Sequence, residues 1–489
     1  MTPAQRARST KLAFAVCLGA GFISMLDVSI VNVALPSIER SLDAAPSALQ
    51  WIVSGYTLAF GLVLITAGRL GDTIGRRRLF MGGLTGFIIA STACALVPSA
   101  PVLAAVRLAQ GFAAGFISPQ VIGFIQQLFQ GGQRARAFGA FGAMVGIATS
   151  VGPLVGGSVI ALFGAQEGWR AVFLVNVPIG ATLLVLAARF LPADQPPRRR
   201  PGLDILGLAL LGLAVLAIML PFIHSPDADT GVGTAPWWLL GVGGALLVGF
   251  IAWERYFERR GGSVVMPAGL LKTPSFSFGT AVGLTYFAGF TSVFLLITLF
   301  LQDGLGLTPL QAGLAVTPFA IIGGVGSMVS GRLVMRIGRW TVVLGISIMI
   351  SGLALTGLVA RWSAPEHTAL AVATTMALAG FGGGLVISPN QALTLSQVPL
   401  AYAGTAGATL QTVQRLGTSV GLAVTTGVFF TSLAGSAGNR LDYAHALTAG
   451  LAVTIGMTSI ALLVAVTDAL RRRRTGDIVP GGAPPEQLS

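Results

Sequence analysis

Apolar segments long enough to cross a lipid bilayer recur along the whole of this 489-residue chain. A spanning helix needs about 20 mostly apolar residues. Hydrophobic residues make up 54% of the chain and charged residues only 10%, so polar groups cannot cover a water-facing surface. Because a helix satisfies its backbone hydrogen bonds internally, we predict an all-α integral membrane protein. The 14 predicted transmembrane helices lie near residues 12–34, 50–70, 79–98, 101–124, 136–163, 169–190, 204–222, 236–256, 276–301, 309–331, 340–360, 367–390, 404–430 and 445–469.

The distribution of basic residues predicts the orientation of these spans. Of the 30 Lys and Arg residues, 24 fall in termini and loops on one side and 4 on the other. Because basic residues gather in cytoplasmic loops, we expect a multi-pass protein of the cell inner (cytoplasmic) membrane with both termini in the cytoplasm. The same rule accounts for the net charge of +13, so nucleic acid is not an expected partner. Lys occurs only at Lys11 and Lys272, a bias that indicates a GC-rich bacterium.

One charged phrase occurs twice, as GRLGDTIGRRR (Gly68 to Arg78) and as GRLVMRIGR (Gly331 to Arg339). Each copy follows the second span of a set of six, and the two sets are separated by a Pro- and Arg-rich linker and two further spans. We therefore predict two pseudo-symmetric six-helix bundles plus two extra central helices, with a substrate site between the bundles near the bilayer midplane. The predicted domains are an N-terminal bundle (1–194), the linker with the two extra helices (195–274), a C-terminal bundle (275–470) and a cytoplasmic tail (471–489).

Four segments resemble signatures of the major facilitator superfamily. They are its loop signature (GRLGDTIGRRR), the first-span signature of its drug:proton antiporters (LDVSIVNVALP, Leu26 to Pro36), its fourth-span motif (RLAQGFAAG, Arg107 to Gly115) and its fifth-span antiporter signature (GAMVGIATSVGPLVGG, Gly142 to Gly157). With 14 predicted spans, the chain is most similar to the fourteen-spanner drug:proton antiporter family. The resemblance implies a proton-coupled antiporter that exports lipophilic drugs or toxic compounds from the cytoplasm by alternating access. The alternative is a dedicated exporter of a single metabolite, antibiotic or lipid.

Three ionisable residues lie deep inside predicted spans: Asp27, Arg107 and Arg415. Such residues are costly in lipid and face the bundle interior or a water-filled cavity. From the rise per residue, Asp27 and Arg107 both lie about 10 Å below the outer surface, so we hypothesise that they face each other. Burial disfavours a charged carboxylate whereas a nearby arginine favours it, which makes Asp27 a candidate proton carrier. A static buried salt bridge is the alternative. The resemblance implicates both residues in proton coupling.

Arg415 shares one helix face with Gln411 and Ser419, four residues before and after it. This face either lines the substrate cavity or forms a structural network with neighbouring helices. For the asparagines among the other candidates, a helix break or an interhelical hydrogen bond is the alternative interpretation. For the aromatic residues, contact with lipid is the alternative. The substrate-cavity candidates are Asn32, Tyr56, Asn176, Phe290, Asn390, Gln411 and Arg415.

The first copy of the repeated phrase carries an acid, Asp72, in a predicted short cytoplasmic turn. Asp72 can cap an adjacent helix N-terminus and pair with Arg69 and Arg76. Contacts of this kind, broken and remade, would latch a gate in one state, which is the role the resemblance implies for this loop. Met335 is at the aligned position of the second copy, so its latch is expected to be lost or weaker. The predicted cytoplasmic gate consists of Gly68, Asp72, Gly75 and Arg76.

The fifth predicted span is rich in small residues. Gly142, Gly146 and Ser150 recur every four residues and form a seam that lets helices approach closely. The Gly and Pro residues that follow are expected to weaken and kink the helix. The resemblance makes this seam part of an interface that seals a proton leak, which is compatible with simple packing. The predicted antiporter helix includes Gly146, Gly152, Pro153, Gly156 and Gly157.

Other functional classes lack their motifs in this sequence. The phosphate-binding motif GxxxxGK[ST] is absent because neither Lys follows a Gly. The three histidines do not form a cluster of metal ligands, and no set of catalytic side chains converges at depth. We therefore expect no enzymatic activity, no metal and no cofactor, with the proton gradient as the energy source. The expected partners are a small-molecule substrate, protons and the lipid bilayer, around a monomer.

Overall fold

The computed structural model describes residues 3–44, 46–164, 166–194, 204–223, 236–260, 264, 268–433 and 438–475. Every regular element within these ranges is a helix. Most are α-helices, the shortest being α10 (Ala268–Lys272), whereas Phe300–Gly304 forms a π-helix (η1) and Leu400–Tyr402 a 3₁₀-helix (η2). The prediction of an all-α protein is therefore confirmed for the part of the chain that the structure describes.

Twelve helical segments among the described residues are long and apolar enough to cross a membrane. The two other predicted spans fall on α5 (Gly131–Phe163) and α8 (Ile205–Ile223). The apolar stretches found within these two helices are shorter, Leu154–Phe163 and Ile205–Pro221. A polytopic helical membrane protein is thus confirmed, and the total of 14 spans stays a prediction.

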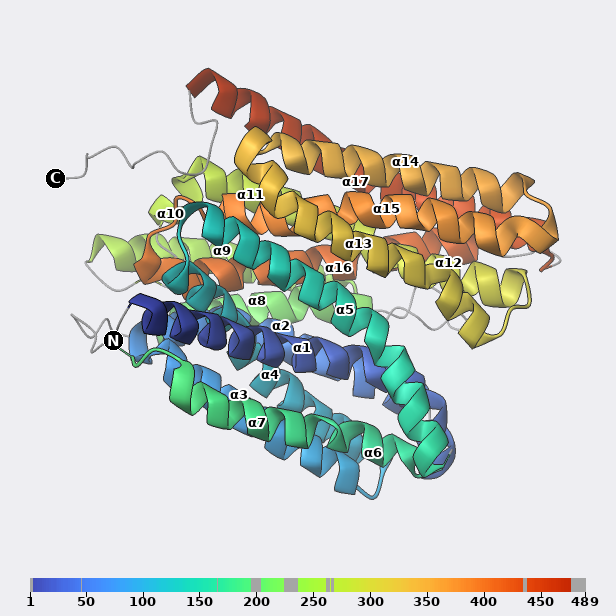
Figure 1. Ribbon diagram of the computed structural model, residues 1–489, viewed down its shortest axis with the longest axis horizontal. Coiled ribbons are helices and arrows are strands. Elements are labelled where there is room, and N and C mark those ends of the chain that lie inside the picture. Colours follow the sequence, from blue (N-terminus) through green and yellow to red (C-terminus); the bar gives the residue numbers. More distant parts are fainter. Residues whose placement is uncertain are drawn as a thin grey trace. The chain divides into compact units, whose positions relative to one another are not determined.

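The chain forms two compact units, and the first comprises residues 1–128, 147–270 and 399–412. Its helices are α1 (Pro3–Leu42), α2 (Pro46–Ile74), α3 (Arg76–Leu96), α4 (Ala100–Leu128), α6 (Gly168–Leu174), α7 (Asn176–Phe190), α8, α9 (Trp238–Arg259) and parts of α5 and α16 (Ala403–Leu433). α4 packs along α2 and α3, and α7 packs against α1 and α3 (Figure 1). The two predicted extra helices, α8 and α9, pack against each other, and α8 also contacts α2.

The second unit comprises residues 129–146, 271–398 and 413–489. Its helices are α11 (Pro274–Phe290), α12 (Ser292–Leu299), η1, α13 (Pro309–Ile337), α14 (Trp340–Trp362), α15 (Pro365–Thr394), α17 (Arg440–Thr475) and the remaining parts of α5 and α16. α13 and α14 both run along α15, and α17 packs against α11 and α14 (Figure 1). Ile346, Met349 and Met376 belong to the buried apolar core of this unit.

Each copy of the repeated phrase is interrupted at a glycine with positive φ, Gly75 alone in the first copy and Gly338 followed by Arg339 in the second. α2 continues to Ile74 and α3 begins at Arg76, so the prediction that Asp72 lies in a turn is wrong; Asp72 lies in the last helical turn of α2. Gly75 has φ of 126° and Gly338, after α13, has φ of 54°. Residues other than glycine rarely adopt such angles. A glycine therefore allows the change of direction in each copy, and the side chains before it keep helical spacing.

Candidate functional site

A fully buried ion pair lies within the first unit. Asp27 of α1 is 0% exposed and Arg107 of α4 is 1% exposed. Nη1 of Arg107 donates to Oδ2 of Asp27 at 2.5 Å. The structure therefore brings together the two residues that the sequence places at the same depth. Their role in proton coupling stays a prediction.

Two amide side chains complete the set of donors around this carboxylate. Gln110 Nε2 donates to Asp27 Oδ1 at 3.0 Å, and Asn176 Nδ2 donates to the same oxygen at 2.8 Å. Both amides are buried. We refer to Asp27, Arg107, Gln110 and Asn176 as the Asp27 cluster. Three donors on one carboxylate stabilise its charged form and offset part of the cost of burying it.

Arg107 also has partners that do not depend on Asp27. Its Nε donates to the carbonyl oxygen of Ile52 at 3.1 Å, and its Nη1 donates to Oε1 of Gln110 at 2.8 Å. The guanidinium carbon lies 4.2 Å from the ring centre of Tyr56, within the range of a cation–π interaction. Tyr56, a predicted cavity residue, is thus buried against the Asp27 cluster. These contacts give the Arg107 guanidinium partners other than Asp27.

Asn176 lies at a break in the hydrogen-bond ladder of the predicted sixth span, where the backbone itself stays helical: Val175, between the two helices, has φ of −55° and ψ of −35°. α6 ends at Leu174 and α7 begins at Asn176. Pro178 has no backbone N–H, so it cannot donate to the carbonyl oxygen of Leu174 and the helical ladder is interrupted there. Ser91 of α3 accepts from Asn176 Nδ2 at 3.1 Å, and its own hydroxyl donates to the carbonyl oxygen of Phe173 at 2.9 Å. For Asn176, the structure therefore favours the interhelical hydrogen bond over the predicted place in a substrate cavity.

Asp72 accepts hydrogen bonds from the first residues of α16. Its Oδ1 accepts from the backbone N–H of Gly404 at 3.1 Å, and its Oδ2 accepts from the N–H and the hydroxyl of Thr405 at 2.9 and 3.0 Å. The carboxylate thus caps α16, where unpaired N–H groups and the helix dipole favour negative charge. Arg76 donates to Asp72 at 2.9 Å and to the carbonyl oxygen of Leu400 at 2.8 Å. Asp72 therefore caps a helix, which is α16, and pairs with Arg76, one of the two predicted arginines.

The glycines of the first copy allow two other segments to come close. A Cβ built on Gly68 would lie 2.6 Å from the carbonyl oxygen of Gly404, and one built on Gly75 would lie 2.3 Å from the carboxylate carbon of Asp194. Asp194 accepts from the N–H of Arg77 at 2.9 Å and from that of the next residue at 3.1 Å, so it caps α3. Asp194 could not be predicted as a cap, because no local pattern links it to a helix start so distant in the chain.

The second copy of the phrase makes neutral contacts with the start of α5 in the second unit. A Cβ built on Gly132 would lie 3.3 Å from Cε of Met335. Ser327, two helical turns before Met335, donates to the carbonyl oxygen of Gly139 at 2.9 Å and shares a 2.9 Å hydrogen bond with Ser388. Met335 thus lies close to Gly132 of α5, at the position where Asp72 forms an ion pair in the first copy.

Arg339, the last residue of the second copy, belongs to a separate buried network. Its Nε donates to Asp468 Oδ2 at 2.6 Å and its Nη1 donates to Asn390 Oδ1 at 2.7 Å. Asn390 Nδ2 in turn donates to the carbonyl oxygen of Gly279 at 2.9 Å. Burial lowers the pKa of Arg339 to about 10, against the opposing effect of Asp468, so the guanidinium is charged at neutral pH. For Asn390 too, the interhelical hydrogen bond is the interpretation that the structure favours.

The predicted antiporter helix approaches α1 through two of its glycines. A Cβ on Gly152 would lie 2.5 Å from Cβ of Ser29, and one on Gly156 would lie 2.9 Å from Cγ1 of Ile30. Gly157, by contrast, has no atom within 4 Å of its Cβ position. Gly152 and Gly156 therefore permit close packing in the first unit, whereas Gly157 faces open space.

The other predicted residues of α5 are placed less tightly. A Cβ on Gly146 would lie 3.8 Å from the carbonyl oxygen of Ala320, which is ordinary van der Waals contact in the second unit. The side chains of Ser150 and Pro153 lie outside the described residues, although the helix assignment continues through both positions. The seam thus includes some positions that need glycine and others that do not.

The remaining cavity candidates lie in different environments. Asn32 is exposed. Phe290 is half-buried in an aromatic cluster of the second unit. Gln411 accepts from the hydroxyl of Ser118 at 2.9 Å within the first unit, and Arg415 lies half-buried one turn further along α16. Within each unit, the structure does not gather these side chains around one space.

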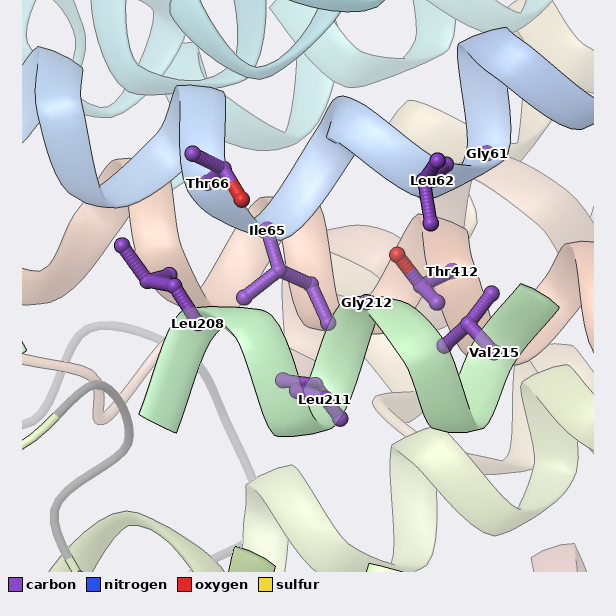
Figure 2. A pocket seen from close by; sticks show the side chains of 9 residues that line it. All are labelled: Gly61, Leu62, Ile65, Thr66, Leu208, Leu211, Gly212, Val215 and Thr412. Atoms are coloured by element: carbon purple, nitrogen blue, oxygen red, sulfur yellow. The ribbon is translucent and has the colours of Figure 1, made fainter. Parts of the chain in front are cut away.

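A small cavity separates α2 from α8 in the first unit. Figure 2 shows Leu62 and Ile65 of α2 facing Leu208 and Leu211 of α8, with Thr412 of α16 beside them. The cavity volume is about 10 Å³. Drug-sized ligands occupy pockets of about 300 Å³ or more, so this space is a packing gap between α8 and its neighbours.

Known proteins share this fold and much of this sequence. The family model described as Major Facilitator Superfamily matches residues 17–422. The chain is 36% identical over 433 residues to the "Probable actinorhodin transporter" of Streptomyces coelicolor, which covers 88% of this chain and 74% of that protein. It is 33% identical over 420 residues to the "Multidrug resistance protein Stp" of Mycobacterium tuberculosis, covering 85% and 75%.

Among solved structures, the major facilitator superfamily proton:xylose symporter XylE matches with a TM-score of 0.64 at 16% identity, over 96% of each chain, which indicates a shared fold. The twelve apolar helical segments agree with that fold. The chain therefore belongs to the Major Facilitator Superfamily and is a multi-pass bacterial membrane transporter rather than an enzyme.

Proposed function

We propose that the protein exports lipophilic drugs or antibiotics from the cytoplasm in exchange for protons, by alternating access, as a member of the fourteen-spanner drug:proton antiporter family. The relatives named as an actinorhodin transporter and as a multidrug resistance protein support export of such compounds. The observation that carries the proton-coupled part of the proposal is the buried Asp27 cluster.

The chemistry of this cluster suits reversible proton binding. A buried carboxylate with three donors is stable while charged, and protonation would remove its attraction to Arg107. Arg107 would still donate to Gln110 and Ile52 and lie against Tyr56, so its charge would not be left without partners. Asp27 could therefore bind and release a proton without leaving Arg107 as an isolated buried cation, which is what makes breaking most buried ion pairs unfavourable.

Asp72 supplies the second part of the proposed mechanism, a latch at the cytoplasmic end. Its carboxylate joins the end of α2 to the start of α16, two helices from opposite predicted bundles. In alternating access these contacts would break when the cytoplasmic side opens and form again when it closes. With both termini in the cytoplasm, the Asp72 contacts face the side from which substrate enters.

A dedicated exporter of one compound is the second candidate. The name of one relative refers to a single compound, actinorhodin, and that of another to many drugs, so both breadths of substrate occur at about one-third identity. Expression in an efflux-deficient bacterium separates the two candidates. Resistance to many unrelated compounds supports the multidrug exporter, whereas resistance to a single compound supports the specialist.

Transport in vesicles tests proton coupling directly. Purified protein in sealed liposomes should move a fluorescent lipophilic cation such as ethidium when a pH difference is imposed, and a protonophore should abolish this movement. Asp27→Asn keeps the size of the side chain and removes its titration, so it should abolish the pH-driven component. Glu167→Gln, which alters an exposed ion pair with Arg170, is the matched control and should transport as the wild type does. A pH-driven movement that persists in Asp27→Asn would contradict the role of Asp27.

A further inference from the structure

Asn176 differs from the other donors of the Asp27 cluster in the helix that carries it. Arg107 and Gln110 lie three residues apart on α4, which runs without interruption from Ala100 to Leu128. Asn176 is the first residue of α7, directly after the break that follows α6. Asn176, one of the three donors to the Asp27 carboxylate, thus lies where one backbone hydrogen bond of the helix is missing.

We infer that Asn176 is a positioning residue for the proton step, and that the break between α6 and α7 controls how tightly Asp27 holds a proton. This inference rests on the proposed proton-coupled export. With Asn176 in place, Oδ1 of Asp27 accepts two hydrogen bonds, which favour the charged carboxylate. When α7 moves away from α1 at the break, Oδ1 keeps only the bond from Gln110, and a proton binds more readily.

A chain of hydrogen bonds connects the two sides of the break to the carboxylate. The carbonyl oxygen of Phe173, on α6, accepts from the hydroxyl of Ser91, whose oxygen accepts from Asn176 Nδ2. The same nitrogen donates to Asp27 Oδ1. Since Phe173 and Asn176 lie on opposite sides of the break, a change of angle there disrupts at least one bond of this chain. A shift of the backbone is thereby converted into a change in the donors around Asp27.

The charged and titratable groups around Asp27 on the other helices differ from Asn176 in chemistry. They are Arg107 on α4, Cys94 on α3 and Tyr56 on α2. α6 carries Arg170, but this residue pairs with Glu167 and donates to the carbonyl oxygen of Ala95. The described part of the sixth span therefore acts on Asp27 through a neutral amide, which can be withdrawn without moving a charge.

A direct titration of Asp27 tests the inference without a transport assay. Full-length protein in lipid nanodiscs is titrated by infrared spectroscopy, and the carboxylic-acid C=O band of Asp27 is identified by its loss in Asp27→Asn. Asn176→Ala removes one donor to the carboxylate and should raise the pH midpoint of this band by about one unit, a tenfold tighter proton binding. Ser91→Ala leaves the donor but removes the group that orients it, so it should give a smaller shift in the same direction.

Asn390→Ala is the matched control, because it also removes a buried asparagine with two hydrogen bonds but lies in the second unit. It should leave the Asp27 midpoint unchanged. An Asp27 midpoint in Asn176→Ala that is equal to or lower than that of the wild type would overturn the inference. If Asn176→Ala does not fold, a Ser91→Ala variant with the wild-type midpoint would overturn it instead. Liposomes that show no pH-driven transport alongside a shifted midpoint would instead refute the proposed function and leave the positioning role of Asn176 intact.

Discussion

Separating the Asp27–Arg107 pair should reveal a large energetic coupling between the two residues. Both side chains are almost completely buried, so removing one partner leaves a charge with no solvent to stabilise it. Breaking such a pair typically costs about 3–5 kcal/mol. Both single variants, Asp27→Asn and Arg107→Gln, should fall near the lower end of that range, because the remaining charge keeps other partners in each. Arg107 keeps its bonds to Gln110 and to the carbonyl oxygen of Ile52. The Asp27 carboxylate keeps the donors Gln110 and Asn176.

The double variant Asp27→Asn/Arg107→Gln contains no buried charge and should cost less than the two single variants together. We expect a coupling energy of about 2–3 kcal/mol. Unfolding by SDS in mixed micelles, followed by tryptophan fluorescence, measures the free energy of unfolding of all four proteins. The same cycle at Glu167 and Arg170, whose side chains are 63% and 28% exposed, should give a coupling of about 0–1 kcal/mol. Equal coupling energies in the two cycles would refute the argument that burial makes the Asp27–Arg107 pair strong.

Three further variants test the latch and the antiporter helix. Asp72→Asn keeps an acceptor for the N–H groups at the start of α16 but removes the negative charge that the helix dipole stabilises there. The cytoplasmic end should therefore open more often, and a cysteine introduced by Thr405→Cys should react faster with a membrane-impermeant reagent added from the cytoplasmic side. An unchanged labelling rate would argue against the latch. Gly152→Ala places a methyl group within 2.5 Å of Ser29 and should lower the free energy of unfolding by about 1–3 kcal/mol, measured by SDS unfolding. The methyl group of Gly157→Ala enters open space, so this variant should be neutral or should raise the free energy of unfolding by up to about 1 kcal/mol. Equal losses of stability in Gly152→Ala and Gly157→Ala would show that contact with α1 is not the reason for glycine at position 152.

Residue spacing alone predicts the meeting of Asp27 with Arg107. Each residue can be counted from the end of its own span, and a fixed rise per residue converts that count to depth. Gln110 could have been found in the same way, because it lies three residues after Arg107 and so shares its helix face. Depth and helical spacing are therefore reliable in a membrane chain, where the bilayer supplies a common reference plane.

Partners that depend on the arrangement of helices could not be predicted in this way. Asn176 fits a cavity wall or an interhelical bond equally well in sequence, and only the packing of α7 against α1 brings it to Asp27. Asp72 could be expected to cap a helix, but nothing in its surroundings identifies α16, which is 332 residues away at Gly404. Pairing between distant segments is set by the side chains of whole helix faces, which no short motif encodes.

Asp194 connects the end of the segment that follows α7 to the repeated phrase. It is the last described residue before the linker that leads to α8, and its carboxylate is bonded to the backbone at the start of α3. Arg76, at that same start, is bonded in turn to Asp72. A displacement of Asp194 would therefore act on the start of α3, which carries the arginine that pairs with Asp72, without altering any residue of the α2–α3 break.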